Sequence, residues 1–152
     1  MELKDVAEWA ESFEPKPGLL AFLGNRIGLT GVLAVATFLL PDFVEERGCV
    51  LLPWQFEQST FDEWWESLDG DRSRIEDVIN HTHLWDLFAS RPDDPLEQHA
   101  IESLGRLVAN SWERVLGADF PDRSFTVTCS NDPDTDYGPT VTFYSDHTDH
   151  PV

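Results

Sequence analysis

Basic residues are scarce in this sequence. Ten Lys and Arg stand against 29 Asp and Glu among 152 residues, for a formal net charge of −19. Proteins bind nucleic acid and anionic membrane surfaces by neutralising phosphate with Lys and Arg. The charge therefore disfavours a nucleic-acid or membrane partner, and it favours a basic protein partner drawn in by long-range attraction. A solvated, salt-adapted surface is the alternative explanation of the same charge.

Cysteine is rare as well, and the sequence lacks the motifs of common catalytic sites. Cys49 and Cys129 have no CxxC or Cys/His metal spacing. There is no GxSxG, P-loop or GxGxxG motif, so nothing indicates a cofactor or a catalytic nucleophile. The first 13 residues are acidic and amphipathic, without the basic n-region of a signal peptide. We expect a cytoplasmic protein with two buried free thiols, while a disulfide stays open if their strands adjoin.

Apolar runs are short. The longest without a charge is Ile27–Leu40, of 14 residues. A membrane-spanning helix takes about 20 residues. The run therefore predicts a buried central helix that stops before Pro41.

The remaining patterns indicate helices and two β-hairpins. Helical spacing marks residues 3–13 and 96–116, and Thr60 and Asp71 are the expected N-caps of two helices between them. Alternating strands around tight turns predict hairpins within 43–52 and 124–145, the second with one face buried and one polar. The expected fold is α+β: a single domain, 1–152, with four to five helices packed on a small antiparallel sheet built from the two hairpins. Residues 146–152 are expected to form a mobile tail.

The segment FDEWWESL, Phe61 to Leu68, is the strongest candidate for partner binding. On a helix, Trp64 faces the core with its neighbours three and four residues away, while Trp65 shares its side with carboxylates. A Trp among carboxylates suits an Arg- or Lys-rich partner, because Trp is enriched at interface hot spots and binds cations over its ring. Burial of both Trp side chains is the alternative. The predicted partner-binding residues are Asp62, Glu63, Trp65, Glu66 and Asp69.

The segment NHTHLWDLF, Asn80 to Phe88, is the candidate for metal chemistry. If the helix begun at Arg72 continues through it, two histidines two residues apart point about 200° from each other and cannot share one ion. Only an extended segment would put both on one side. We therefore expect a polar helix end, with a metal-assisted enzyme as the alternative. That alternative uses His81, His83, Asp86, His147 and His150.

One further loop carries a metal-like spacing. Asp132, Asp134 and Asp136 have the one-three-five spacing of an EF-hand. Tyr137 and Phe143 occupy the positions that require Gly and Glu, so an EF-hand is excluded. Turn chemistry accounts for the loop, with a weak, irregular cation site as the alternative.

In composition and expected architecture the chain resembles bacterial immunity proteins and similar small acidic toxin neutralisers. No motif carries this resemblance, so no residue roles follow from it. The resemblance implies a non-catalytic binding protein that recognises a basic partner. The alternatives are the metal-assisted enzyme and a structural or oligomeric component held by edge strands of the second hairpin.

Overall fold

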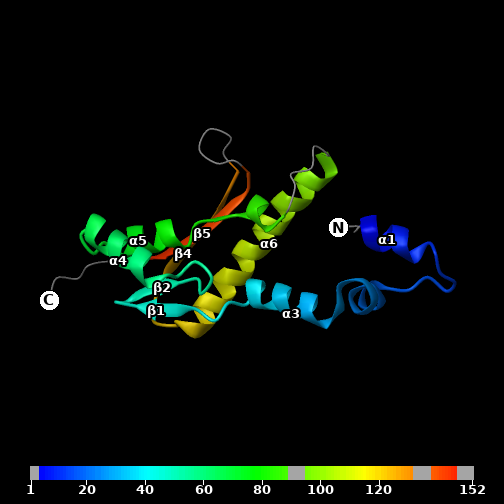
Figure 1. Ribbon diagram of the computed structural model, residues 1–152, viewed down its shortest axis with the longest axis horizontal. Coiled ribbons are helices and arrows are strands. Elements are labelled where there is room, and N and C mark those ends of the chain that lie inside the picture. The colour runs from blue at the N-terminus through cyan, green and yellow to red at the C-terminus, as the bar shows by residue number, and fades with distance from the viewer. Residues whose placement is uncertain (1–3, 89–94, 132–137, 147–152) are drawn as a thin grey trace. The chain divides into compact units, whose positions relative to one another are not determined.

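A computed structural model describes residues 4–88, 95–131 and 138–146. It confirms the α+β class. The chain divides into two compact units, residues 1–39 and 40–152, and each is described by itself (Figure 1). The expectation of a single domain over 1–152 stays a prediction.

The regular elements described in the first unit are all helices. It contains α1 (Lys4–Ala10), α2 (Leu19–Phe22), the π-helical turn η1 (Leu23–Ile27) and α3 (Gly28–Leu39). The stretch from Leu19 to Leu39 is long and apolar enough to cross a membrane, judged by length and composition alone. None of its residues is buried. The prediction of a buried central helix here was wrong, although α3 ends before Pro41 as expected.

The second unit begins with a hairpin, β1 (Val44–Glu46) and β2 (Cys49–Leu51), paired with Glu46 opposite Cys49. Its turn residues Arg47 and Gly48 both have positive φ, 48° and 83°. Such a turn matches the right-handed twist of the strands. A Cβ at Gly48 would lie 2.9 Å from the end of the flexible Arg72 side chain, which can move aside, so it is the positive φ that favours glycine at this position. The predicted hairpin is confirmed.

Two short helices follow the hairpin. These are α4 (Gln58–Ser67) and α5 (Arg72–Ile79). Asp71 caps α5 as predicted, accepting from the backbone N–H of Arg74 at 3.2 Å. The cap of α4 is Glu57 and not Thr60, because the longer carboxylate reaches the N–H groups of Ser59 and Thr60.

The rest of the unit is a three-stranded sheet and a long helix. The chain continues through β3 (Thr82–His83), the 3₁₀ turn η2 (Leu84–Leu87), α6 (Pro95–Asp119), β4 (Phe125–Ser130) and β5 (Thr140–Ser145). The sheet order is β3-β5-β4, all antiparallel. The two hairpins therefore belong to separate sheets and not to one. α6 continues through Gly117 to Asp119, beyond residue 116 where the helical spacing was expected to end.

β5 is covered on both faces, which corrects the expected division into a buried and a polar face. Phe143 packs against Trp112 of α6, with ring centroids 6.1 Å apart. The adjacent Thr142 points to the opposite face and donates to the carbonyl of Asp77 in α5 at 2.9 Å. Both residues are buried. A second cluster of buried residues is contributed by β2, α4 and α5: Cys49, Leu51, Phe61, Ile75 and Ile79.

Candidate functional site

The acidic side of α4 carries the predicted partner-binding residues. Its core side is anchored by Phe61, which is fully buried, while Trp64 and Trp65 are half-buried against the same cluster. Glu63, Glu66 and Asp69 are exposed, and none of their carboxylates forms an ion pair within the described part of the chain. We call these three residues the α4 acidic face.

Arg47 occupies the space beside this face. Its guanidinium lies 2.8 Å from the Asp62 carboxylate and 5.3 Å from the centroid of the Trp65 ring. It also lies 5.6 Å from the ring of Phe61. The positive-φ hairpin turn thus delivers a cation to the Trp65–Asp62 pair. The chain itself shows that this carboxylate and this ring accept a guanidinium, by an ion pair and a cation–π contact.

The sequence did not indicate Arg47 as a residue of this surface. The turn was predicted, but its position against α4 depends on how the hairpin packs on the helix. No local signal in residues 43–52 indicates that packing.

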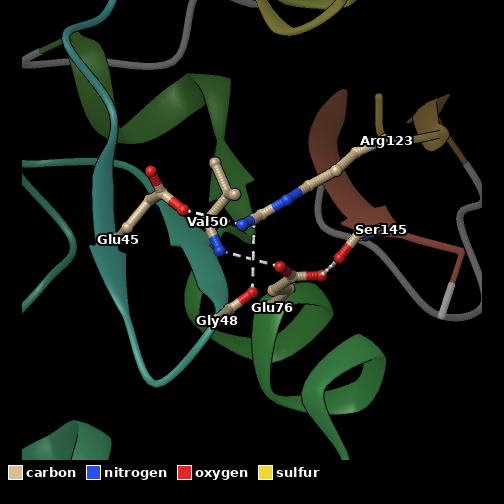
Figure 2. Close-up of polar contacts among 6 residues, drawn as sticks. All are labelled: Glu45, Gly48, Val50, Glu76, Arg123 and Ser145. Carbon is tan, nitrogen blue, oxygen red and sulfur yellow. Dashed lines mark hydrogen bonds and ion pairs between the residues drawn. The ribbon is translucent and has the colours of Figure 1, made fainter. Parts of the chain in front are cut away.

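A buried polar pair on α5 was also missed. Glu76 and Asn80 have no exposed surface and lie one turn apart. Glu76 accepts from the backbone N–H of Val50 at 2.7 Å and of Ser145 at 2.6 Å (Figure 2). Asn80 accepts from Leu52 N–H at 2.9 Å and donates to the carbonyls of Val50, at 3.0 Å, and Phe143, at 3.2 Å. β3 pairs with β5 only at Thr140 and Val141. The two side chains therefore connect the edge of β2 to the part of β5 that β3 leaves unpaired.

A polar recess lies next to this pair. It has a volume of about 360 Å³, and its lining includes Arg72, Asp122, Arg123 and Asp146. Arg123 is held by the Glu45 carboxylate at 2.7 Å and donates to the carbonyl of Gly48 at 3.3 Å (Figure 2). Two guanidiniums and two carboxylates offset one another in charge, so the recess is not selective for ions of one sign.

The structure brings two of the predicted metal ligands together. α5 ends at Ile79, and Thr82–His83 is extended, so the expected helix through this segment is wrong. The imidazoles of His81 and His83 lie 4.7 Å apart, and His83 Nδ1 is 2.9 Å from the Thr140 hydroxyl. Among the described residues, no group of three or more His, Cys, Asp or Glu side chains could hold a metal ion.

Several predicted residues lie outside the described part of the chain. These are His147, His150 and the loop residues Asp132, Asp134 and Asp136. Asp146, at the start of the expected tail, is described. Its backbone N–H donates to Ser124 O at 2.9 Å.

The two cysteines are free, and neither is activated as a nucleophile. Cys49 is buried and Cys129 is exposed, which corrects the expectation that both are buried. Desolvation raises the pKa of Cys49 to about 12, with the nearby Glu76 adding to the shift. Desolvation also raises the pKa of Cys129. Because the thiolate is the reactive form, neither position favours nucleophilic catalysis.

We compared the chain with protein-family models, with curated proteins and with solved structures, and none of them matches it.

Proposed function

We propose that the chain is a non-catalytic binding protein that recognises a basic protein partner, in the manner of an immunity or inhibitor protein. The proposed contact surface is the α4 acidic face together with its neighbours Asp62 and Trp65. The observation that carries the proposal is the seating of Arg47 on Asp62 and Trp65. A surface that binds a guanidinium of its own chain has the chemistry to bind one from a partner.

The free carboxylates extend that chemistry outward. Glu63 and Glu66 lie three residues apart on α4, and Asp69 follows just after the helix end. Side chains at this spacing share one side of a helix. Lys or Arg side chains of a partner can pair with them without displacing Arg47.

The overall charge supports the same partner class. A net charge of −19 steers a basic protein toward this chain and repels nucleic acid. The proposal places the second unit, residues 40–152, which carries the α4 acidic face, in the cytoplasm.

The test compares three baits in a lysate of cells that express the protein. The baits are the wild type, the double variant Glu63→Lys/Glu66→Lys on α4, and the double variant Glu113→Lys/Asp119→Lys on α6. The α6 pair is exposed and changes the net charge by the same amount, so it controls for charge alone. Bound proteins are eluted with a salt gradient and quantified by mass spectrometry.

We expect one basic protein that the wild type and the α6 variant retain to moderate salt and that the α4 variant loses. Loss of binding in both variants alike would assign the interaction to bulk charge and remove the α4 surface. A set of unrelated basic proteins released at the first salt step would overturn the proposal.

A further inference from the structure

We propose that the segment Leu19–Leu39 inserts into the hydrocarbon core of a lipid bilayer and anchors the chain there. The inference does not depend on the proposed function, because it concerns the first unit alone. It starts from the exposure of the segment. Leu20 is 83% exposed, Leu29 76% and Leu33 56%, and no residue of α2, η1 or α3 is buried.

The apolar surface surrounds the helix. Leu33 and Val35 lie two residues apart, so they point about 200° away from each other. Both are more than half exposed. A helix that docks on a protein surface presents a single apolar stripe, whereas a helix that is apolar all round is buried in a large core or spans a membrane. Because the segment is not buried, the all-round pattern favours lipid.

The length of the segment fits a bilayer. As one continuous α-helix its 21 residues would span about 31 Å, and the hydrocarbon core is about 30 Å thick. In the structure Gly28, with a φ of 75°, separates η1 from α3, so the spanning form requires Gly28 to become helical. Arg26 is the segment's one charged residue. It lies about 11 Å from the start of the segment along the axis, where a long side chain can reach the headgroup region.

Two polar side chains of the segment are hydrogen-bonded within it. The amide of Asn25 donates to the carbonyl of Ala21 at 2.7 Å, and the hydroxyl of Thr37 donates to that of Leu33 at 3.0 Å. In lipid there is no water to satisfy such groups, so internal partners are required.

An aromatic cluster lies at the N-terminal end of the segment. The Trp9 ring contacts Phe13, with centroids 4.9 Å apart, and Phe22, at 5.6 Å. Trp is enriched where a spanning helix meets the headgroup region. The expectation of no membrane contact rested partly on burial of Ile27–Leu40, which the structure does not show.

The test uses the full chain, purified in mild detergent and reconstituted with phosphatidylcholine vesicles. These vesicles carry no net charge, so their surface does not repel the negatively charged chain. The variant is Leu33→Asp. Its matched control is Leu107→Asp on α6, at a leucine of similar exposure, 52%, in the other unit. Vesicle flotation after an alkaline carbonate wash gives the partition coefficient, and hydrogen exchange reports on the amides of α3.

We expect the wild type and Leu107→Asp to float, and the α3 amides to be protected in vesicles. Leu33→Asp should lower partitioning roughly a hundredfold, because an Asp near the centre of a spanning helix strongly opposes insertion. Its melting transition should match the wild type, since Leu33 packs in no core.

Three outcomes would overturn the proposal. The first is a chain that stays in the aqueous phase, and the second is flotation that both substitutions weaken equally. The third is a stable dimer in vesicle-free buffer that Leu33→Asp dissociates, which would assign the segment to a second copy of the chain.

Discussion

Arg47 shows how one side chain links the fold to the proposed function. Its φ of 48° belongs to the hairpin turn, and its guanidinium lies on Asp62 and Trp65. The ion pair is exposed, so its contribution to folding is small and screened by salt. Its main consequence is for the partner surface, because it neutralises one of the carboxylates predicted to contact a partner.

Replacing Arg47 with Ala should therefore strengthen partner binding. The substitution frees Asp62 and Trp65, which should tighten the complex roughly fivefold, the equivalent of one ion pair of about 1 kcal/mol. The free energy of unfolding should fall by about 1 kcal/mol as the ion pair and the cation–π contact are lost. Titration calorimetry and urea unfolding measure the two effects.

Arg74→Ala is the matched control, because Arg74 is exposed and the net charge changes equally. Weaker binding by Arg47→Ala than by Arg74→Ala would show that Arg47 itself contacts the partner.

Glu57 predicts a dependence of stability on pH. Hydrogen bonds, first from the Ser59 hydroxyl and then from the Thr60 backbone N–H and hydroxyl, lower its pKa from 4.5 to about 2. A carboxylate with a lowered pKa stabilises the fold fully above its unfolded pKa, and this contribution disappears as the pH falls through the folded value. Glu57→Gln should therefore lower the Tm at pH 7, and its deficit should shrink from pH 4.5 downward and vanish below about pH 2.

Thermal melts of Glu57→Gln and of the exposed, non-capping Glu63→Gln across this range test the prediction. A deficit for Glu57→Gln that is constant with pH would exclude charged capping as the cause.

At the scale of elements, α5 holds the second unit together. Glu76 and Asn80 hydrogen-bond the edge of β2 and the part of β5 beyond its pairing with β3, and these two strands belong to different sheets. The helix thus replaces direct strand pairing between the two hairpins. Buried polar groups of this kind stabilise a fold only while every partner is in place.

Removing Glu76 should be strongly destabilising. Glu76→Ala leaves the backbone N–H groups of Val50 and Ser145 without this acceptor, which should cost about 2–6 kcal/mol at about 1–3 kcal/mol for each buried donor. Urea unfolding measures the loss. Hydrogen exchange should show the Val50 and Ser145 amides losing protection together.

Asp77→Ala, at the next position of the same helix, is the control and should change stability by less than about 1 kcal/mol. If only one of the two amides lost protection, the bridge between the sheets would be contradicted.

The sequence predicts the local elements well and the contacts between them poorly. The turn at Arg47-Gly48 and the cap at Asp71 follow from local residue preferences. The Glu76–Asn80 bridge joins Val50 to Ser145, nearly a hundred residues apart, so no local pattern reveals it. The helix expected through His81 fails because β5 pairs Thr82 with Val141, and this tertiary pairing overrides the helical spacing.

At the scale of the whole molecule, the two units carry different kinds of surface. The first unit carries an exposed, all-round apolar segment, and the second carries the acidic surface with its guanidinium-binding pair. Because the charge of −19 acts over a long range, salt should affect the rate of association more than the rate of dissociation. The association rate with a basic partner should fall roughly a hundredfold from low to high salt.

The central claim is that the α4 acidic face binds a basic protein, and the Kd of the captured partner tests it most directly. Titration at low salt should give a Kd about a hundredfold weaker for Glu63→Lys/Glu66→Lys than for the wild type, roughly tenfold for each reversed charge. The Kd of Glu113→Lys/Asp119→Lys should change by less than about threefold, since its charges lie away from the contact. Equal weakening in the two double variants would contradict the account.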